Sequence, residues 1–109
     1  MFHFHGKIYM DEKVKEKPGK YRKMVERRRG LRRCFVITLP VNSENSLEMY
    51  SSREFWFQHY RKMGLEIVGL AADRNGAESL LCQIALDVYR TYQVVDASHV
   101  KSYFLGKGE

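Results

Sequence analysis

The stretch that decides the fold spans residues 47–92 and reads LEMYSSREFWFQHYRKMGLEIVGLAADRNGAESLLCQIALDVYRTY. Two runs within it, Leu47–Tyr50 and Glu66–Ala72, are apolar and rich in residues that favour strands. Each run is followed by a helix-capping signal and then by apolar residues at the spacing of a helix. This alternation predicts a βαβ unit with one further helix. It does not by itself indicate a chemistry.

The first predicted helix of this stretch begins at a capping box, Ser51–Glu54, and ends at Gly64. Its apolar residues recur at helical spacing, so we expect them to pack in the core and to leave Phe57 on one flank. The residues of this stripe are Trp56, Tyr60 and Met63.

The second predicted helix is the clearest in the chain. It begins at a second capping box, Asn75–Glu78, and its apolar residues follow the helical period for more than four turns. The residues of this stripe are Ala77, Leu80, Leu81, Ile84, Ala85, Val88 and Tyr92. The strand before it, Glu66–Ala72, is almost continuously apolar, which is typical of a strand that is buried on both faces and paired in parallel.

The segments upstream of this stretch are less regular. Phe2–Met10 alternates between apolar and polar residues, which predicts a half-buried strand with a candidate bulge at Gly6. Asp11–Lys17 is charged and has no period, so we expect a connection. Pro18–Arg29 predicts an amphipathic helix that stops at Gly30. Its apolar stripe is thin, and a partly disordered basic arm is the alternative.

The remaining elements complete the predicted fold. Arg33–Leu39 is rich in β-branched residues and forms a hairpin with Leu47–Tyr50. Near the C-terminus, Asp96 suits the cap of a short helix, and a terminal strand over the same residues is the alternative. The order β-α-β-β-α-β, with an added C-terminal helix, matches a ferredoxin-like sandwich. Such a fold has a four-stranded, mostly antiparallel sheet with helices on one face.

Composition is that of one globular domain: the chain has 109 residues, of which 44% are hydrophobic and 29% charged. We expect a single α+β domain over residues 1–109, with a basic N-terminal third (1–33) and a scaffold at 47–92. Cys34 and Cys82 have no metal-binding spacing, and no signal-peptide pattern or membrane-spanning run is present. The sequence therefore favours a cytoplasmic protein with free, buried thiols and no contact with a membrane.

Two passages of the chain, LEMYSS at 47–52 and EIVGLAADRNGAESLL at 66–81, resemble short proteins of anaerobic Gram-positive bacteria whose function is uncharacterised. The resemblance covers roughly the last two-thirds of the chain and rests on strand and cap signals. It implies a bacterial, cytoplasmic origin and assigns a role to no residue.

Positive charge is concentrated at one end of the chain. Residues 1–33 carry twelve Lys or Arg and four acids, which gives +8, whereas residues 34–109 carry seven and nine, which gives −2. Two interpretations remain open: binding to nucleic acid or another polyanion, and a solvated face or one that pairs with an acidic protein surface. The residues that we assign to polyanion contact are Lys20, Arg22, Lys23, Arg27, Arg28, Arg29, Arg32 and Arg33.

Three further features have both a functional and a structural explanation. His3 and His5 share one strand face, as a metal pair does, but no third ligand is nearby, so we expect surface histidines and no metal. The loop at 72–76 precedes a helix and suits an anion, although a helix cap explains it equally. Aromatic residues at helical spacing are typical of a core, and Phe57 is the candidate for contact with a protein partner.

Catalytic patterns are absent from the sequence. It contains no nucleophile elbow, no Cys–His pair with an orienting acid and no close carboxylate dyad, so we expect no catalytic residue and no cofactor. The sequence favours a small intracellular binding module whose partner is another protein or a second copy, as in a homodimer. The alternative is a module that binds nucleic acid or another polyanion through residues 1–33.

Overall fold

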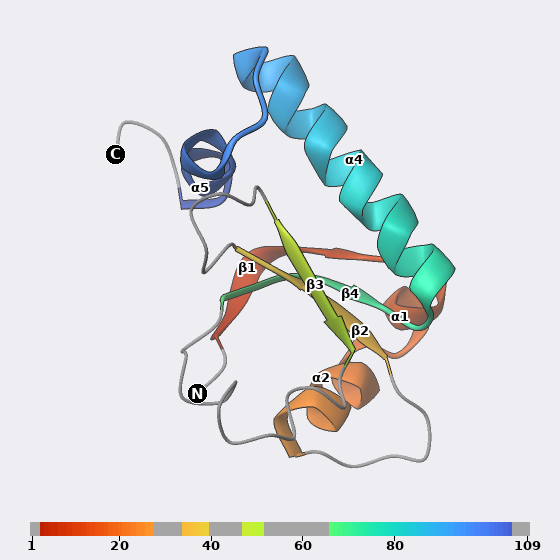
Figure 1. Cartoon of the computed structure of the whole chain (residues 1–109). Helices are drawn as coiled ribbons and strands as arrows, with labels where there is room; N and C mark the ends of the chain where they lie inside the picture. The colour runs from red at the N-terminus through yellow and green to blue at the C-terminus, as the bar shows by residue number, and fades with distance from the viewer. Residues whose placement is uncertain (1–2, 28–33, 40–46, 52–65, 106–109) are drawn as a thin grey trace.

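A mixed four-stranded sheet forms the centre of the molecule (Figure 1). The computed structural model describes residues 3–27, 34–39, 47–51 and 66–105. The strands are β1 (His3–Met10), β2 (Phe35–Thr38), β3 (Glu48–Ser51) and β4 (Glu66–Ala71), in the order β1-β4-β2-β3. β1 and β4 are parallel, and the two other pairs are antiparallel. The α+β class is therefore confirmed.

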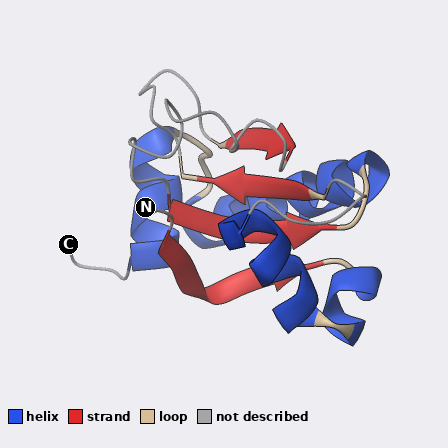
Figure 2. Ribbon diagram, turned by 90° about the horizontal axis from the view of Figure 1, so that it is seen from below, coloured by secondary structure: helices blue, strands red, loops and turns tan. Residues whose placement is uncertain are grey.

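Helices cover both faces of this sheet, as Figures 1 and 2 show. The helices are α1 (Glu12–Glu16), α2 (Pro18–Arg27), α4 (Arg74–Tyr92) and α5 (Ala97–Leu105). α1 and α2 pack on one face, and α4 and α5 pack on the other. The expectation of helices on one face is wrong, and the strand order does not confirm a ferredoxin-like topology.

The sheet has a separate hydrophobic core on each of its two faces. Along β2, Phe35 and Ile37 point towards α4, whereas Val36 points towards α1 and α2, because side chains alternate along a strand. β4 likewise contributes Val68 to one core and Ile67 to the other, and both side chains are fully buried. The continuous apolar run of β4 thus reflects burial on both faces. β4 pairs in parallel with β1, as such a run often does, and antiparallel with β2.

Pairing within the sheet agrees with two local predictions. β2 and β3 form the predicted antiparallel pair, with Phe35 opposite Ser51. In β1, Phe4 pairs with Ile67 and Tyr9 with Gly69, so the register advances by five residues on β1 and by two on β4. This irregularity surrounds Gly6, where the sequence indicates a bulge.

The helix boundaries correct two predictions. Residues 12–16 form α1 where a connection was expected, because Asp11 caps a turn whose one apolar residue, Val14, is fully buried. α4 begins at Arg74 with Asp73 as its N-cap, so the predicted capping box at Asn75–Glu78 is wrong. The acceptor for the Gly76 N–H is Asp73 Oδ1, at 2.8 Å.

The C-terminal element is a helix, α5, and not the alternative strand. Val100 and Phe104 are buried against α4, and Tyr103 packs beside them, as its helical spacing predicts. Both cysteines were expected to be buried, and Cys34 is. Cys82 is exposed, because position 82 lies just beyond the buried stripe of α4. The predicted helix after Ser51 lies outside the described residues.

The carboxylate of Asp11 joins the ends of β1 and β4 to the start of α1. Its Oδ1 accepts from the Val14 N–H and its Oδ2 from the Ala72 N–H, both at 2.9 Å. The Asp11 N–H donates to the Leu70 carbonyl at 3.2 Å. A Cβ at position 76 would collide with the Asp11 carboxylate, so Gly76 leaves the room that this group occupies.

Replacement of Asp11 and Gly76 tests this junction. We expect Asp11→Ala to lower the free energy of unfolding by about 1–3 kcal/mol, because it removes a helix cap and leaves the Ala72 N–H unpaired. Gly76→Ala destabilises the native protein but is neutral or stabilising in the Asp11→Ala background, since the collision is gone and Ala favours helix. Urea unfolding of the four proteins measures the coupling. Additive effects of the two substitutions would contradict the close contact.

Asp96 makes the stability of α5 depend on pH. Its Oδ1 accepts from the His99 N–H at 2.8 Å and lies 2.6 Å from His99 Nδ1, and these contacts lower the pKa of Asp96. A carboxyl group whose pKa is lower in the folded state adds stability above its unfolded pKa of about 3.9 and loses it as the pH falls below that value. We expect Asp96→Asn to show a smaller fall in melting temperature than the native protein between about pH 5 and pH 3. Equal falls would exclude this contribution.

Candidate functional site

The outer sides of α1 and α2 form a positively charged surface. Six cations on these helices and at the residue between them have exposed side chains: Lys13, Lys15, Lys17, Lys20, Arg22 and Lys23. We call these six residues the basic helical surface. Lys13 forms an ion pair with Asp73 at 3.6 Å, and Lys15 forms one with Glu12 at 3.7 Å.

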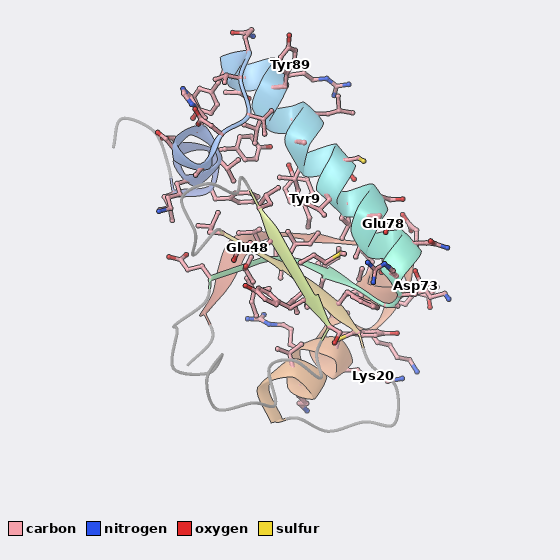
Figure 3. The ribbon with its side chains drawn as sticks, in the orientation of Figure 1. Tyr9, Lys20, Glu48, Asp73, Glu78 and Tyr89 are labelled. Atoms are coloured by element: carbon pink, nitrogen blue, oxygen red, sulfur yellow. The ribbon has the colours of Figure 1, made fainter. Side chains whose placement is uncertain are left out.

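Packing on the sheet explains why these cations face solvent. Val25 of α2 is fully buried, and Tyr21 packs against the same core as Val36. The opposite side of the helix therefore points outwards, and Lys20 Nζ lies 5.8 Å from the centre of the Tyr21 ring. Figure 3 shows Lys20 on α2, across the sheet from α4. α2 is thus a helix from Pro18 to Arg27, and the alternative of a disordered arm is wrong for these residues.

A pocket of about 340 Å³ lies beside β1, next to the basic helical surface. Its lining includes three consecutive residues of β1, one residue of α1, two of α4 and one of α5. These residues are Ile8, Tyr9, Met10, Lys15, Leu80, Gln83 and Tyr103. We call it the edge pocket, because β1 is the outermost strand on this side of the described sheet. Lys15 belongs to both the pocket and the basic helical surface.

Hydrogen bonds fix the pocket wall on the side of α4 and α5. Tyr9 Oη donates to Asp87 Oδ2 at 2.6 Å, and the hydroxyls of Tyr9 and Tyr103 lie 2.8 Å apart. The Tyr9 ring also meets the edge of the Phe104 ring, with centroids 5.9 Å apart. Figure 3 shows Tyr9 between the sheet and α4. These contacts join β1 to both helices.

Burial of the Tyr9 ring raises the pKa of its hydroxyl well above the usual value, and the bonds to Asp87 and Tyr103 raise it further. Tyr9 therefore stays a neutral phenol at ordinary pH. Its proton is held by Asp87, which also lies 3.7 Å from Arg90. A neutral phenol whose proton is already shared suits a structural bond better than proton transfer to a substrate.

The structure brings together only some of the residues assigned to polyanion contact. Lys20, Arg22 and Lys23 share the outer side of α2, whereas Arg27 lies at the end of α2 with its side chain outside the described part. The other candidates lie outside the described residues: Arg28, Arg29, Arg32, Arg33 and Phe57. The basic run of the sequence begins earlier, at Lys13, Lys15 and Lys17, which lie on α1 and at its C-cap.

The structure describes the contacts of the loop candidate but not the side chains of the two histidine candidates. His3 and His5 lie in β1, but their side chains are outside the described part. Among the residues that the structure does describe, no three His, Cys, Asp or Glu side chains gather as a metal site. In the loop at 72–76, the N–H groups of Ala72 and Gly76 are taken by Asp11 and Asp73. A helix cap therefore explains this loop better than an anion site.

A second hollow, of about 690 Å³, runs along the outer side of α4. Leu86 of its lining is 52% exposed, and Tyr89 of the same helix is 53% exposed. Both lie off the buried stripe of Ile84 and Val88, and sequence reasoning did not single them out. Cys82 also lines this hollow, which is open to solvent along its length.

No family model matches this chain, and no curated protein or solved structure is significantly similar to it. Of the helices that the structure describes, none is both long and apolar enough to cross a bilayer. The functional interpretation therefore rests on the geometry of the basic helical surface and the edge pocket.

Proposed function

We propose that the protein is a non-catalytic binding module whose basic helical surface binds a negatively charged region of a protein partner. The observation that supports this most is the exposure of six cations on α1, on α2 and at Lys17 between them. The acidic residues of these two helices are Glu12, Glu16 and Glu26. The buried residues Val14 and Val25 fix both helices to the sheet. The cations therefore form a preorganised surface, which lowers the entropic cost of binding.

A protein partner accounts for one feature that phosphate binding does not. Lys15 lies on the edge pocket beside the apolar side chains of Ile8, Met10 and Leu80. A sugar–phosphate backbone offers few apolar groups to such a pocket, whereas protein segments combine acidic side chains with large apolar ones. Nucleic acid remains the second candidate, because exposed Lys and Arg on a helix are the usual phosphate contacts.

A non-catalytic role is supported by the groups at the edge pocket. The Tyr9 hydroxyl is bonded to Asp87 and Tyr103, and Lys15 forms an ion pair with Glu12. These titratable side chains already have partners in the protein. Their arrangement suits recognition, in which the scaffold is rigid and the partner adapts to it.

Charge reversal at Lys20 tests this proposal against a matched control. We expect Lys20→Glu to weaken binding of fluorescent poly-L-glutamate by at least about threefold at low salt, because the exposed side chain faces the bound polyanion. Lys101→Glu makes the same change of charge on α5 and leaves the affinity within about twofold. Fluorescence anisotropy over a series of salt concentrations measures both variants.

A duplex DNA of mixed sequence, titrated in parallel, distinguishes the two candidates. The proposal predicts that DNA binds no more tightly than poly-L-glutamate at equal salt. Much tighter binding of DNA, with a steep salt dependence that Lys20→Glu reduces, would favour the nucleic-acid candidate. Absence of binding to both polymers at low salt would contradict each of them.

A further inference from the structure

Backbone groups of β1 face the edge pocket. The Asp11 N–H donates to the Leu70 carbonyl of β4, and Tyr9 pairs with Gly69, so the peptide groups of both residues point towards β4. Because these groups alternate along a strand, both groups of Met10 point away from β4, and so does the Ile8 C=O, which shares a peptide with the Tyr9 N–H. Both residues line the edge pocket. Within the described chain, no hydrogen bond outside the sheet ladder engages their N–H or C=O groups.

The bulge in β1 defines how much of this edge is regular. Register is broken between Phe4 and Tyr9 and is continuous from Tyr9 to Met10. Bulges at sheet edges interrupt pairing with further strands. The regular part of the edge therefore begins at the peptide that joins Ile8 to Tyr9, where the bonds between Tyr9, Asp87 and Tyr103 hold β1 in place.

The two walls of the edge pocket differ in chemistry. Lys15 stands on the wall formed by α1, with 57% of its side chain exposed. The opposite wall is formed by α4 and α5, where Leu80 and Tyr103 present apolar surface. A strand laid along β1 would direct alternate side chains to these two walls.

We propose that the edge pocket binds an extended segment of a protein partner, which pairs with Ile8 and Met10 and adds a fifth strand to the sheet. The segment alternates acidic side chains, which meet Lys15, with apolar side chains, which meet Leu80 and Tyr103. Main-chain hydrogen bonds supply affinity and the alternating contacts supply specificity, as in other cases of strand addition. This inference rests on the proposed function in one respect, the negative charge of the partner.

Charge complementarity identifies the occupant. Lys15 lies in the pocket, Lys13 lies on the same short helix, and Lys17 is its C-cap. Of the acidic groups on this wall, the Asp11 carboxylate accepts from Val14 and Ala72, and Glu16 is exposed. Glu12 pairs with Lys15 at 3.7 Å, but both side chains are largely exposed, so a bound carboxylate can replace Glu12. Residues 11–17 are balanced in charge, but residues 11–27, which include α2, carry seven Lys or Arg and four acids. The two helices together therefore favour a segment with negative charge over a neutral one or a second basic surface.

The probe for this proposal is a fluorescent peptide, blocked at both ends, that alternates glutamate and valine. A peptide of the same composition, with all glutamates before all valines, is its control. We expect the alternating peptide to bind at least about tenfold more tightly, because only its side chains reach both walls in register.

Proline at position 10 tests the backbone pairing. Met10→Pro removes an N–H that faces away from β4, a position where an edge strand tolerates proline. We expect it to weaken binding of the alternating peptide by about threefold to tenfold relative to Met10→Ala, which loses the same side chain but keeps the N–H. Melting temperatures show whether both variants fold, and Ile8→Pro with Ile8→Ala repeats the comparison if Met10→Pro does not.

Three results would overturn the inference. The first is equal binding of the two peptides, and the second is equal effects of proline and alanine at positions 8 and 10. The third is self-association in sedimentation that Met10→Pro abolishes, because that result would assign the edge to a second copy. The proposed function fails separately, when Lys20→Glu leaves the affinity for poly-L-glutamate unchanged. A salt-dependent effect of Lys20→Glu, together with no effect of proline, would retain the function and exclude strand addition.

Discussion

The structure depends on the carboxylate of Asp11. One side chain closes the first turn of α1 and also accepts from the backbone at the end of β4. Its own N–H continues the pairing of β1 with β4 for one more residue. The carboxylate therefore sets the direction in which the chain leaves the sheet. Because α1 carries Lys15 only four residues later, the position of this cation at the edge pocket follows from the same contacts.

Two helical layers around one sheet create the pocket itself. A sheet that is covered on one face has an edge that is open to solvent. Here α1 lies on one face of the sheet beside the edge of β1, and α4 and α5 lie on the other face. The edge thus forms the floor of a recess with two different walls. Contacts of Tyr9 with Asp87 and Tyr103 keep β1 in register with the wall formed by α4 and α5. Strand geometry and helix packing together give the recess its shape.

Local signals in the sequence predict most individual elements. The long apolar stripe that includes Leu80 and Ile84 predicts α4, and the continuous apolar run at 66–72 predicts a strand buried on both faces. The second observation already requires a layer of helices on each face, which the ferredoxin-like expectation did not include. α1 was missed because it has one buried apolar residue, Val14, although an aspartate directly after a strand is a capping signal.

The site is harder to predict because its parts are far apart in the chain. The basic residues of α2 are visible as a charged run, but the bond between Tyr9 and Asp87 joins residues 78 positions apart. Strand order depends on such contacts, and no local pattern shows that β4 lies between β1 and β2. The edge pocket is therefore apparent only in the folded chain, whereas the charge of its surroundings can be predicted from composition alone.

Amide hydrogen exchange, resolved by residue with NMR, tests the central claim most directly. In the free protein, the N–H groups of Tyr9 and Asp11 should be protected by β4, and those of Ile8 and Met10 should exchange at least about tenfold faster. Saturation with the alternating glutamate–valine peptide should slow exchange at Ile8 and Met10 and leave Tyr9 and Asp11 unchanged. Protection of Ile8 and Met10 in the free protein, or no change when the peptide is bound, would contradict the addition of a strand at β1.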